Sequence, residues 1–71
     1  MNDELTENYI RAFKQLVDLV RDTDTAMARA RQDHDQLGVR QYQHLKQDYV
    51  HQLAELISQA PQSIQVQAVP Q

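Results

Sequence analysis

Cysteine is missing from this chain of 71 residues, and glycine occurs once. Without cysteine, disulfide bridges and zinc–thiolate sites are excluded as sources of stability. With a single glycine, no glycine-rich loop can cradle a phosphate group, so P-loop and dinucleotide-binding enzymes are excluded as well. The length allows one domain at most and leaves no room for separate substrate and cofactor lobes.

The chain also lacks a strong excess of charge of one sign, and it has no long apolar runs. Seven basic residues stand against ten acidic ones, so the net charge is -3 and nucleic acid is disfavoured as a partner. No apolar run exceeds three residues, and the chain opens Met1-Asn2-Asp3-Glu4 rather than with a basic and apolar leader. We therefore expect a cytoplasmic protein without a signal peptide or a membrane span.

What the sequence does hold is helical periodicity. Apolar side chains recur every three or four residues between Leu5 and Ala30, which predicts an amphipathic helix over about residues 4 to 32. Acidic residues gather near the start of this segment, and Arg29 and Arg31 lie near its end. Both charges match the sign that the helix macrodipole favours.

A second helix is expected over about residues 36 to 59, because apolar residues recur there at the same spacing until Pro61 forbids continuation. Asp33 or Asp35 can accept the free backbone N–H groups at its start. The loop, about residues 33 to 36, is so short that the two helices must lie side by side and antiparallel. The fold class is therefore all-α, with an antiparallel αα-hairpin over residues 1 to 60.

Residues of the two helices should face each other when their numbers sum to about 70. This rule pairs Phe13 with Ile57 and Val20 with Val50. It also pairs Asp24 with Lys46, and both of these interrupt apolar seams. The pair either fixes the register of the helices at some cost in stability, or both side chains reach solvent at the edge of the seam.

The apolar arc of the first helix is wider than one neighbouring helix can cover, since it reaches from Leu19 through Leu16 to Ile10. Two hairpins pairing into a four-helix bundle would bury the surplus, so we expect a homodimer. The alternative is that a different protein docks on the same uncovered apolar surface. The residues expected to build the intrachain and interchain seams together are Tyr9, Ile10, Phe13, Leu16, Val17, Val20, Met27, Tyr42, Leu45, Tyr49, Leu53 and Leu56.

The last residues, 61 to 71, form an uncharged tail rich in glutamine and proline. Within it apolar and polar residues alternate around Ile64 and Val66, which is typical of a short strand. A lone strand has no stability, so the tail either adds to a partner, pairs with its twin, packs back on the hairpin or stays loosely ordered. Ile64 and Val66 are the candidate partner contacts.

One row of side chains has the spacing of a metal site. His44, Asp48, His51 and Glu55 follow one another at intervals of four, three and four, which lines them along one face of the second helix. That face lies opposite the expected seam and implies no second shell of ligands. We interpret the row as a solvated face and expect no metal or other cofactor.

Catalytic constellations are lacking. The only serines, Ser58 and Ser63, have no oriented base nearby in the expected fold, so no nucleophilic triad is predicted. The aromatic residues lie on the seam sides, where core packing explains them better than stacking on a ligand. We expect no enzyme and no small-molecule substrate.

The sequence thus predicts a small protein–protein interaction module, a homodimeric adaptor, regulator or assembly factor. One alternative is an obligate small subunit that docks on a larger complex through its second apolar face and its tail. A further alternative is a dimeric hairpin that binds nucleic acid through Arg11 and Arg21, although acidic residues are interleaved with these side chains.

Overall fold

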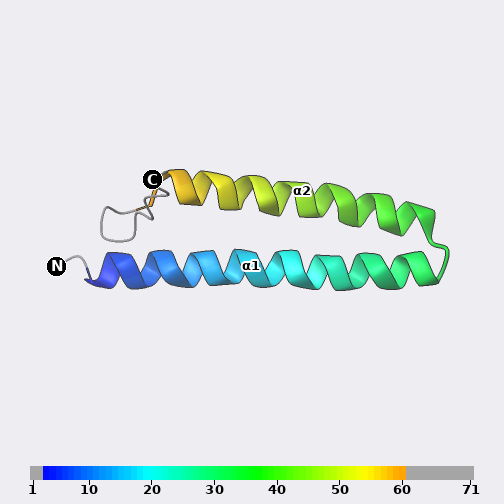
Figure 1. Ribbon diagram of the computed structural model, residues 1–71, viewed down its shortest axis with the longest axis horizontal. Coiled ribbons are helices and arrows are strands. Elements are labelled where there is room, and N and C mark those ends of the chain that lie inside the picture. The colour runs from blue at the N-terminus through cyan, green and yellow to red at the C-terminus, as the bar shows by residue number, and fades with distance from the viewer. Residues whose placement is uncertain (1–2, 61–71) are drawn as a thin grey trace, which may run out of the picture.

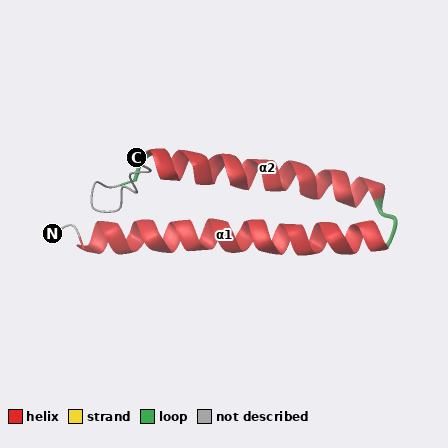
Figure 2. Cartoon of the chain, viewed as in Figure 1, coloured by secondary structure: helices red, strands yellow, loops and turns green. Residues whose placement is uncertain are grey.

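The computed structural model describes residues 3 to 60 as two long helices joined by a tight turn. Helix α1 runs over Asp3–Gln32 and helix α2 over Gln36–Ser58. The helices lie side by side and antiparallel, with the turn at one end of the molecule and both outer helix ends at the other (Figure 1). No strand occurs in the described range (Figure 2). The predicted all-α hairpin is confirmed, whereas the tail with Ile64 and Val66 lies outside the described residues.

The C-terminus of α1 is closed by two backbone hydrogen bonds. The N–H of His34 donates to the carbonyl oxygen of Arg31 at 3.1 Å, and the N–H of Asp35 donates to that of Ala30 at 2.8 Å. This pair of bonds is a Schellman motif, and it places His34 in the left-handed region at φ 56°. Glycine usually fills this position, but the only glycine of the chain stands four residues later.

Asp35 caps the start of α2. Its Oδ1 accepts the backbone N–H of Gly38 at 2.9 Å, which satisfies one of the free donors of the first turn. A Cβ atom at position 38 would overlap this carboxylate, so the absence of a side chain there makes room for the cap. Of the two cap candidates that the sequence offered, the structure selects Asp35 over Asp33.

A regular seam joins the helices. Its positions alternate at intervals of three and four residues on both helices, the spacing of a coiled coil. Near the open end, the hydroxyl of Tyr9 donates to the carbonyl oxygen of Leu56 at 2.6 Å and ties α1 to α2. The seam positions, all buried or half-buried, are Thr6, Tyr9, Phe13, Leu16, Val20, Thr23, Met27 and Ala30 on α1, Val39, Tyr42, Lys46, Tyr49, Leu53 and Leu56 on α2, and Ala60 just beyond the end of α2.

Val50 and Ile57 lie at the border of this seam rather than in it. They were expected to face Val20 and Phe13, yet they keep exposures of 46% and 57%. Each follows a seam position by one residue, which turns it about 100° away from the seam centre. The simple facing rule missed this rotation because it considers distance along the helices and ignores direction around them.

The interior of the hairpin is thin. Among residues 3 to 60 the only buried apolar side chains are Met27 and Ala30, at 5% and 6% exposure. Thr23 is buried beside them, and its hydroxyl donates to the carbonyl oxygen of Leu19 at 2.6 Å. No side chain in this range is completely removed from solvent. Two helices alone enclose very little volume, since each offers only one side to the other.

Candidate functional site

The main candidate surface is a patch of apolar side chains beside the seam, here called the Ile10–Ile57 face. It consists of Ile10 and Val17 on α1 and of Val50 and Ile57 on α2. Each follows a seam position by one residue, so all four are rotated to the same degree from the seam. Ile10 and Val50 are each 46% exposed, and Val17 is half-buried.

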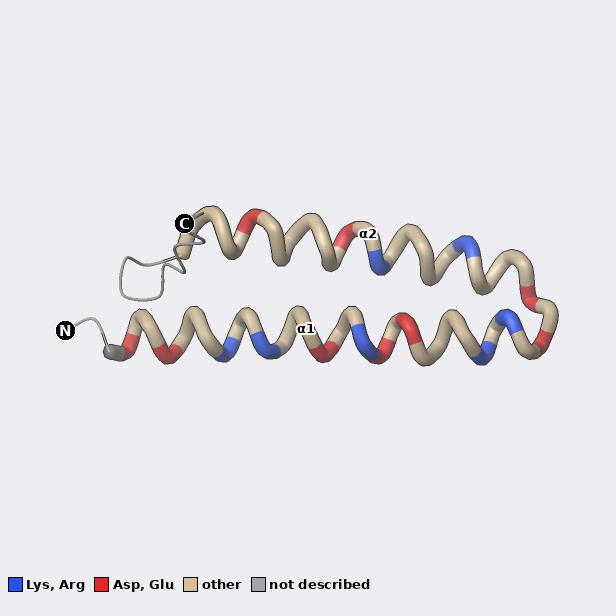
Figure 3. The backbone as a smooth tube through the Cα atoms, viewed as in Figure 1, with Lys and Arg blue, Asp and Glu red and all other residues tan. Residues whose placement is uncertain are grey.

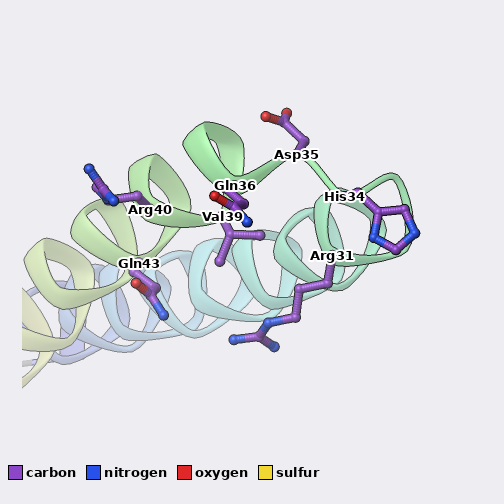
Figure 4. A pocket seen from close by; sticks show the side chains of 7 residues that line it. All are labelled: Arg31, His34, Asp35, Gln36, Val39, Arg40 and Gln43. Atoms are coloured by element: carbon purple, nitrogen blue, oxygen red, sulfur yellow. The ribbon is translucent and has the colours of Figure 1, made fainter.

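Both halves of this face lie on the same side of the hairpin. Continuing by sevens from Val17 leads to Asp24 and Arg31 on α1, and counting back from Val50 leads to Gln43 and Gln36 on α2. Arg31, Gln36 and Gln43 line one opening near the turn, where the side chains of Arg31 and Gln43 point the same way (Figure 4). Side chains seven residues apart on a helix share a face, so Val17 and Val50 share the side of Arg31 and Gln43.

A shallow hollow adjoins the Ile10–Ile57 face on α2. It has a volume of about 410 Å³ and is lined by Lys46, Gln47, Val50, His51 and Ala54. Ala54 is the smallest of these side chains and is exposed. The hollow is wide open and lined by α2 alone, so it leaves the surface beside Val50 accessible to a partner.

The opposite side of the hairpin is apolar too, but its border is acidic. Leu5 and Leu45 are 66% and 39% exposed there. Leu19, which lies between them along the length of the hairpin, is half-buried. The helix positions bordering this side carry the exposed acidic residues Asp22, Asp48 and Glu55 and one exposed basic residue, Arg29. Two copies packed through this side would bring like charges together, so the Ile10–Ile57 face is the better candidate for self-association.

Asp24 and Lys46 form an ion pair across the seam, with the Lys46 Nζ atom 2.8 Å from the Asp24 carboxylate. The side chains keep exposures of 49% and 40%, so solvent screens the pair and it adds little stability. Lys46 nevertheless occupies a seam position, where an apolar side chain would pack better. A lysine at such a position is a known means of fixing the register of a coiled coil at a cost in stability.

The row of His44, Asp48, His51 and Glu55 is exposed along its whole length. Its only ion pair joins the Nε2 atom of His51 to the Oε1 atom of Glu55 at 3.1 Å. In the part of the chain that the structure describes, no three histidine or acidic side chains come together as a metal site requires. The row therefore offers isolated pairs of ligands and no enclosed coordination shell.

The turn carries several basic side chains that do not converge. Arg31, His34 and Arg40 border an opening of about 380 Å³, and Arg31 donates to the sulfur of Met27 at 3.5 Å. Arg31 and Arg40 point in different directions (Figure 4). On α1, Arg21 lies 3.9 Å from the carboxylate of Asp18. Neither region presents a group of cations aimed at one anion.

The structure separates the predicted self-association residues into two groups. Ile10 and Leu45 are exposed, Val17 is half-buried beside the seam, and these three are free to contact a second molecule. Val50 and Ile57, predicted as parts of the intrachain seam, join the outer surface instead. The other nine predicted residues occupy the intrachain seam: Tyr9, Phe13, Leu16, Val20, Met27, Tyr42, Tyr49, Leu53 and Leu56.

Comparison with known proteins finds no matching family model, no matching curated protein and no matching solved structure. Neither α1 nor α2 has a stretch apolar enough for its length to cross a membrane. Any functional conclusion therefore rests on the geometry of the hairpin itself.

Proposed function

We propose that this protein is a non-catalytic interaction module of the cytoplasm that works as a homodimer. The Ile10–Ile57 face carries the proposal, since it exposes three large β-branched side chains on one side of a narrow hairpin. Contiguous exposed apolar side chains of this kind mark interaction surfaces in soluble proteins. Pairing two such faces forms a four-helix bundle.

The thin interior supports a permanent association. A hairpin with only Met27 and Ala30 as buried apolar side chains gains little from its own packing. Small domains of this size usually need disulfides, metals or oligomerisation to stay folded, and the chain has no cysteine. A second copy on the Ile10–Ile57 face would convert its half-exposed side chains into a shared core.

The dimer would leave two regions for other macromolecules. The outer faces of the four helices carry the charged side chains, and the tail carries Ile64 and Val66. We propose that these two tail residues contact a partner protein, because an alternating apolar segment can add to the edge of another chain's sheet. In this arrangement the bundle presents two tails.

The test is the solution mass of the purified chain by light scattering over a hundredfold dilution, with circular dichroism on the same samples. We expect a helical dimer that persists on dilution. The variant Ile57→Lys should shift the mass to the monomer, because it places a charge in the apolar interface. Gln52→Lys, which adds the same charge at an exposed polar position of the same helix, should remain dimeric.

A weakly helical monomer of the unaltered chain would overturn the homodimer. That outcome would favour the obligate-subunit alternative, in which a foreign helix pair covers the same face. A stable dimer that Ile57→Lys leaves intact would move the interface to another side of the hairpin.

A further inference from the structure

The Ile10–Ile57 face occupies only the half of the hairpin that lies away from the turn. Ile10 and Val17 belong to the first half of α1, and Val50 and Ile57 to the second half of α2. On the same side but nearer the turn, the corresponding positions are polar: Asp24, Arg31, Gln36 and Gln43. One side of the molecule is thus divided into an apolar open half and a polar turn half.

This division limits how two copies can pack. Full overlap with the turns at opposite ends would place the apolar half of each copy on the polar half of the other, which buries polar groups without partners. Two arrangements with twofold symmetry place the apolar open half of one copy on the apolar open half of the other. Either both turns lie at the same end with the hairpins overlapping fully, or the copies run in opposite directions and overlap over their open halves alone.

Charge along the hairpin distinguishes these two arrangements. Residues 24 to 46, around the turn and including both members of the Asp24–Lys46 ion pair, carry four basic and three acidic side chains, a net charge of +1. The other described residues carry three basic and seven acidic side chains, a net charge of -4 (Figure 3). Both arrangements bring the acidic open halves together, and placing both turns at one end stacks the two positive turn halves on each other as well. The opposed arrangement keeps these halves at the far ends of the dimer, where they do not repel each other.

We infer that the second copy packs on the Ile10–Ile57 face in the opposed direction, overlapping only the open half. This inference rests on the proposed homodimer. A twofold axis through the centre of the face pairs Ile10 with the partner's Val17, so positions on α1 face each other when their numbers add up to about 27. On α2 the same axis pairs Val50 with the partner's Ile57 and lies beside Ala54, whose small side chain permits close approach.

The borders of the face agree with the opposed direction. The same numbering brings Glu7 next to the partner's Arg21, and twofold symmetry makes this pair twice. Arg21 is held within its own chain only by the exposed contact to Asp18 at 3.9 Å, so it can turn to a partner. Lys14 lies near the axis and faces the partner's Lys14, and the long exposed side chains let the two ammonium groups turn apart into solvent.

The direction can be measured with one engineered cysteine, since the natural chain has none. Leu37 lies at the turn and is 65% exposed, so a spin label on Leu37→Cys reports the distance between the two turns of a dimer. With the overlap described above, the two labels should lie about 50 Å apart, from 1.5 Å of helix rise per residue. Turns at the same end would give about 20 Å or less.

A charge exchange provides a second measurement. Glu7→Arg and Arg21→Glu should each weaken the dimer about tenfold, and the double variant should restore the affinity to within about threefold. Only an intermolecular contact allows this rescue, because the two side chains lie four turns apart on one helix. Arg11→Glu, on the exposed outer face, should leave the affinity nearly unchanged.

These results separate the inference from the proposed function. A dimer with closely spaced labels, or without rescue by the double variant, overturns the opposed direction and leaves the homodimer standing. A monomeric mass for the unaltered chain overturns both.

Discussion

At the scale of single residues, the turn depends on the carboxylate of Asp35 and on the missing side chain of Gly38. Asp35 accepts the N–H of Gly38, and Gly38 leaves room for that carboxylate by having no side chain. The residue before the cap, His34, takes the left-handed conformation that closes α1. One short segment thus ends the first helix and begins the second, which is why the hairpin needs no longer loop.

Asp35→Ala should lower the free energy of unfolding by about 1 kcal/mol, because it removes the N-cap of α2. Thermal unfolding followed by circular dichroism should show a fall in Tm of several degrees. Asp33→Ala is the matched control: it removes the same charge two residues earlier, where the structure shows no cap. Equal losses in the two variants would mean that charge at the turn, and not the cap, is responsible.

At the scale of the helices, Lys46 is the one charged side chain at a seam position. Its ion pair with Asp24 is half-exposed, so it contributes little to stability while excluding a better-packing apolar residue. The seam repeats at intervals of three and four on both helices, and such repeats allow slipped pairings. A lysine that finds its carboxylate in one register alone would disfavour the slipped ones.

Lys46→Met should therefore raise Tm by several degrees and broaden the range of oligomeric masses, since the seam gains packing and loses its register signal. Calorimetry and analytical ultracentrifugation measure the two effects on one sample. Gln41→Met, at an exposed position of the same helix, should change neither. A single sharp dimer in the Lys46→Met variant would speak against a role of Lys46 in register.

At the scale of the whole molecule, stability and association should be one equilibrium. The hairpin has a thin interior and an apolar face beside it, so the folded monomer lacks the burial that the dimer gains. Tm should then rise by about 10 °C over a hundredfold increase in concentration, as expected for a dimer of this size. A Tm independent of concentration would show that the hairpin is stable by itself.

The sequence determined the two helices, their direction and their ends. Apolar residues at intervals of three and four, a short polar loop and a proline after the second helix are local signals, and each acts within a few residues. The same local spacing was enough to place Asp24 opposite Lys46, and the structure shows that ion pair at 2.8 Å. The helical period of about 3.6 residues was also enough to predict that the row from His44 to Glu55 lies on the exposed side of the second helix.

Only the tertiary structure decided which apolar residues the chain uses for its own seam. Val50 and Leu53 are equally apolar in sequence, yet the first is exposed and the second half-buried. The choice depends on the rotation of each helix about its axis, and that rotation is set by packing against the other helix. The cap was decided in the same way, because Asp33 and Asp35 are equivalent as residue types and only the closing geometry of α1 selects one of them.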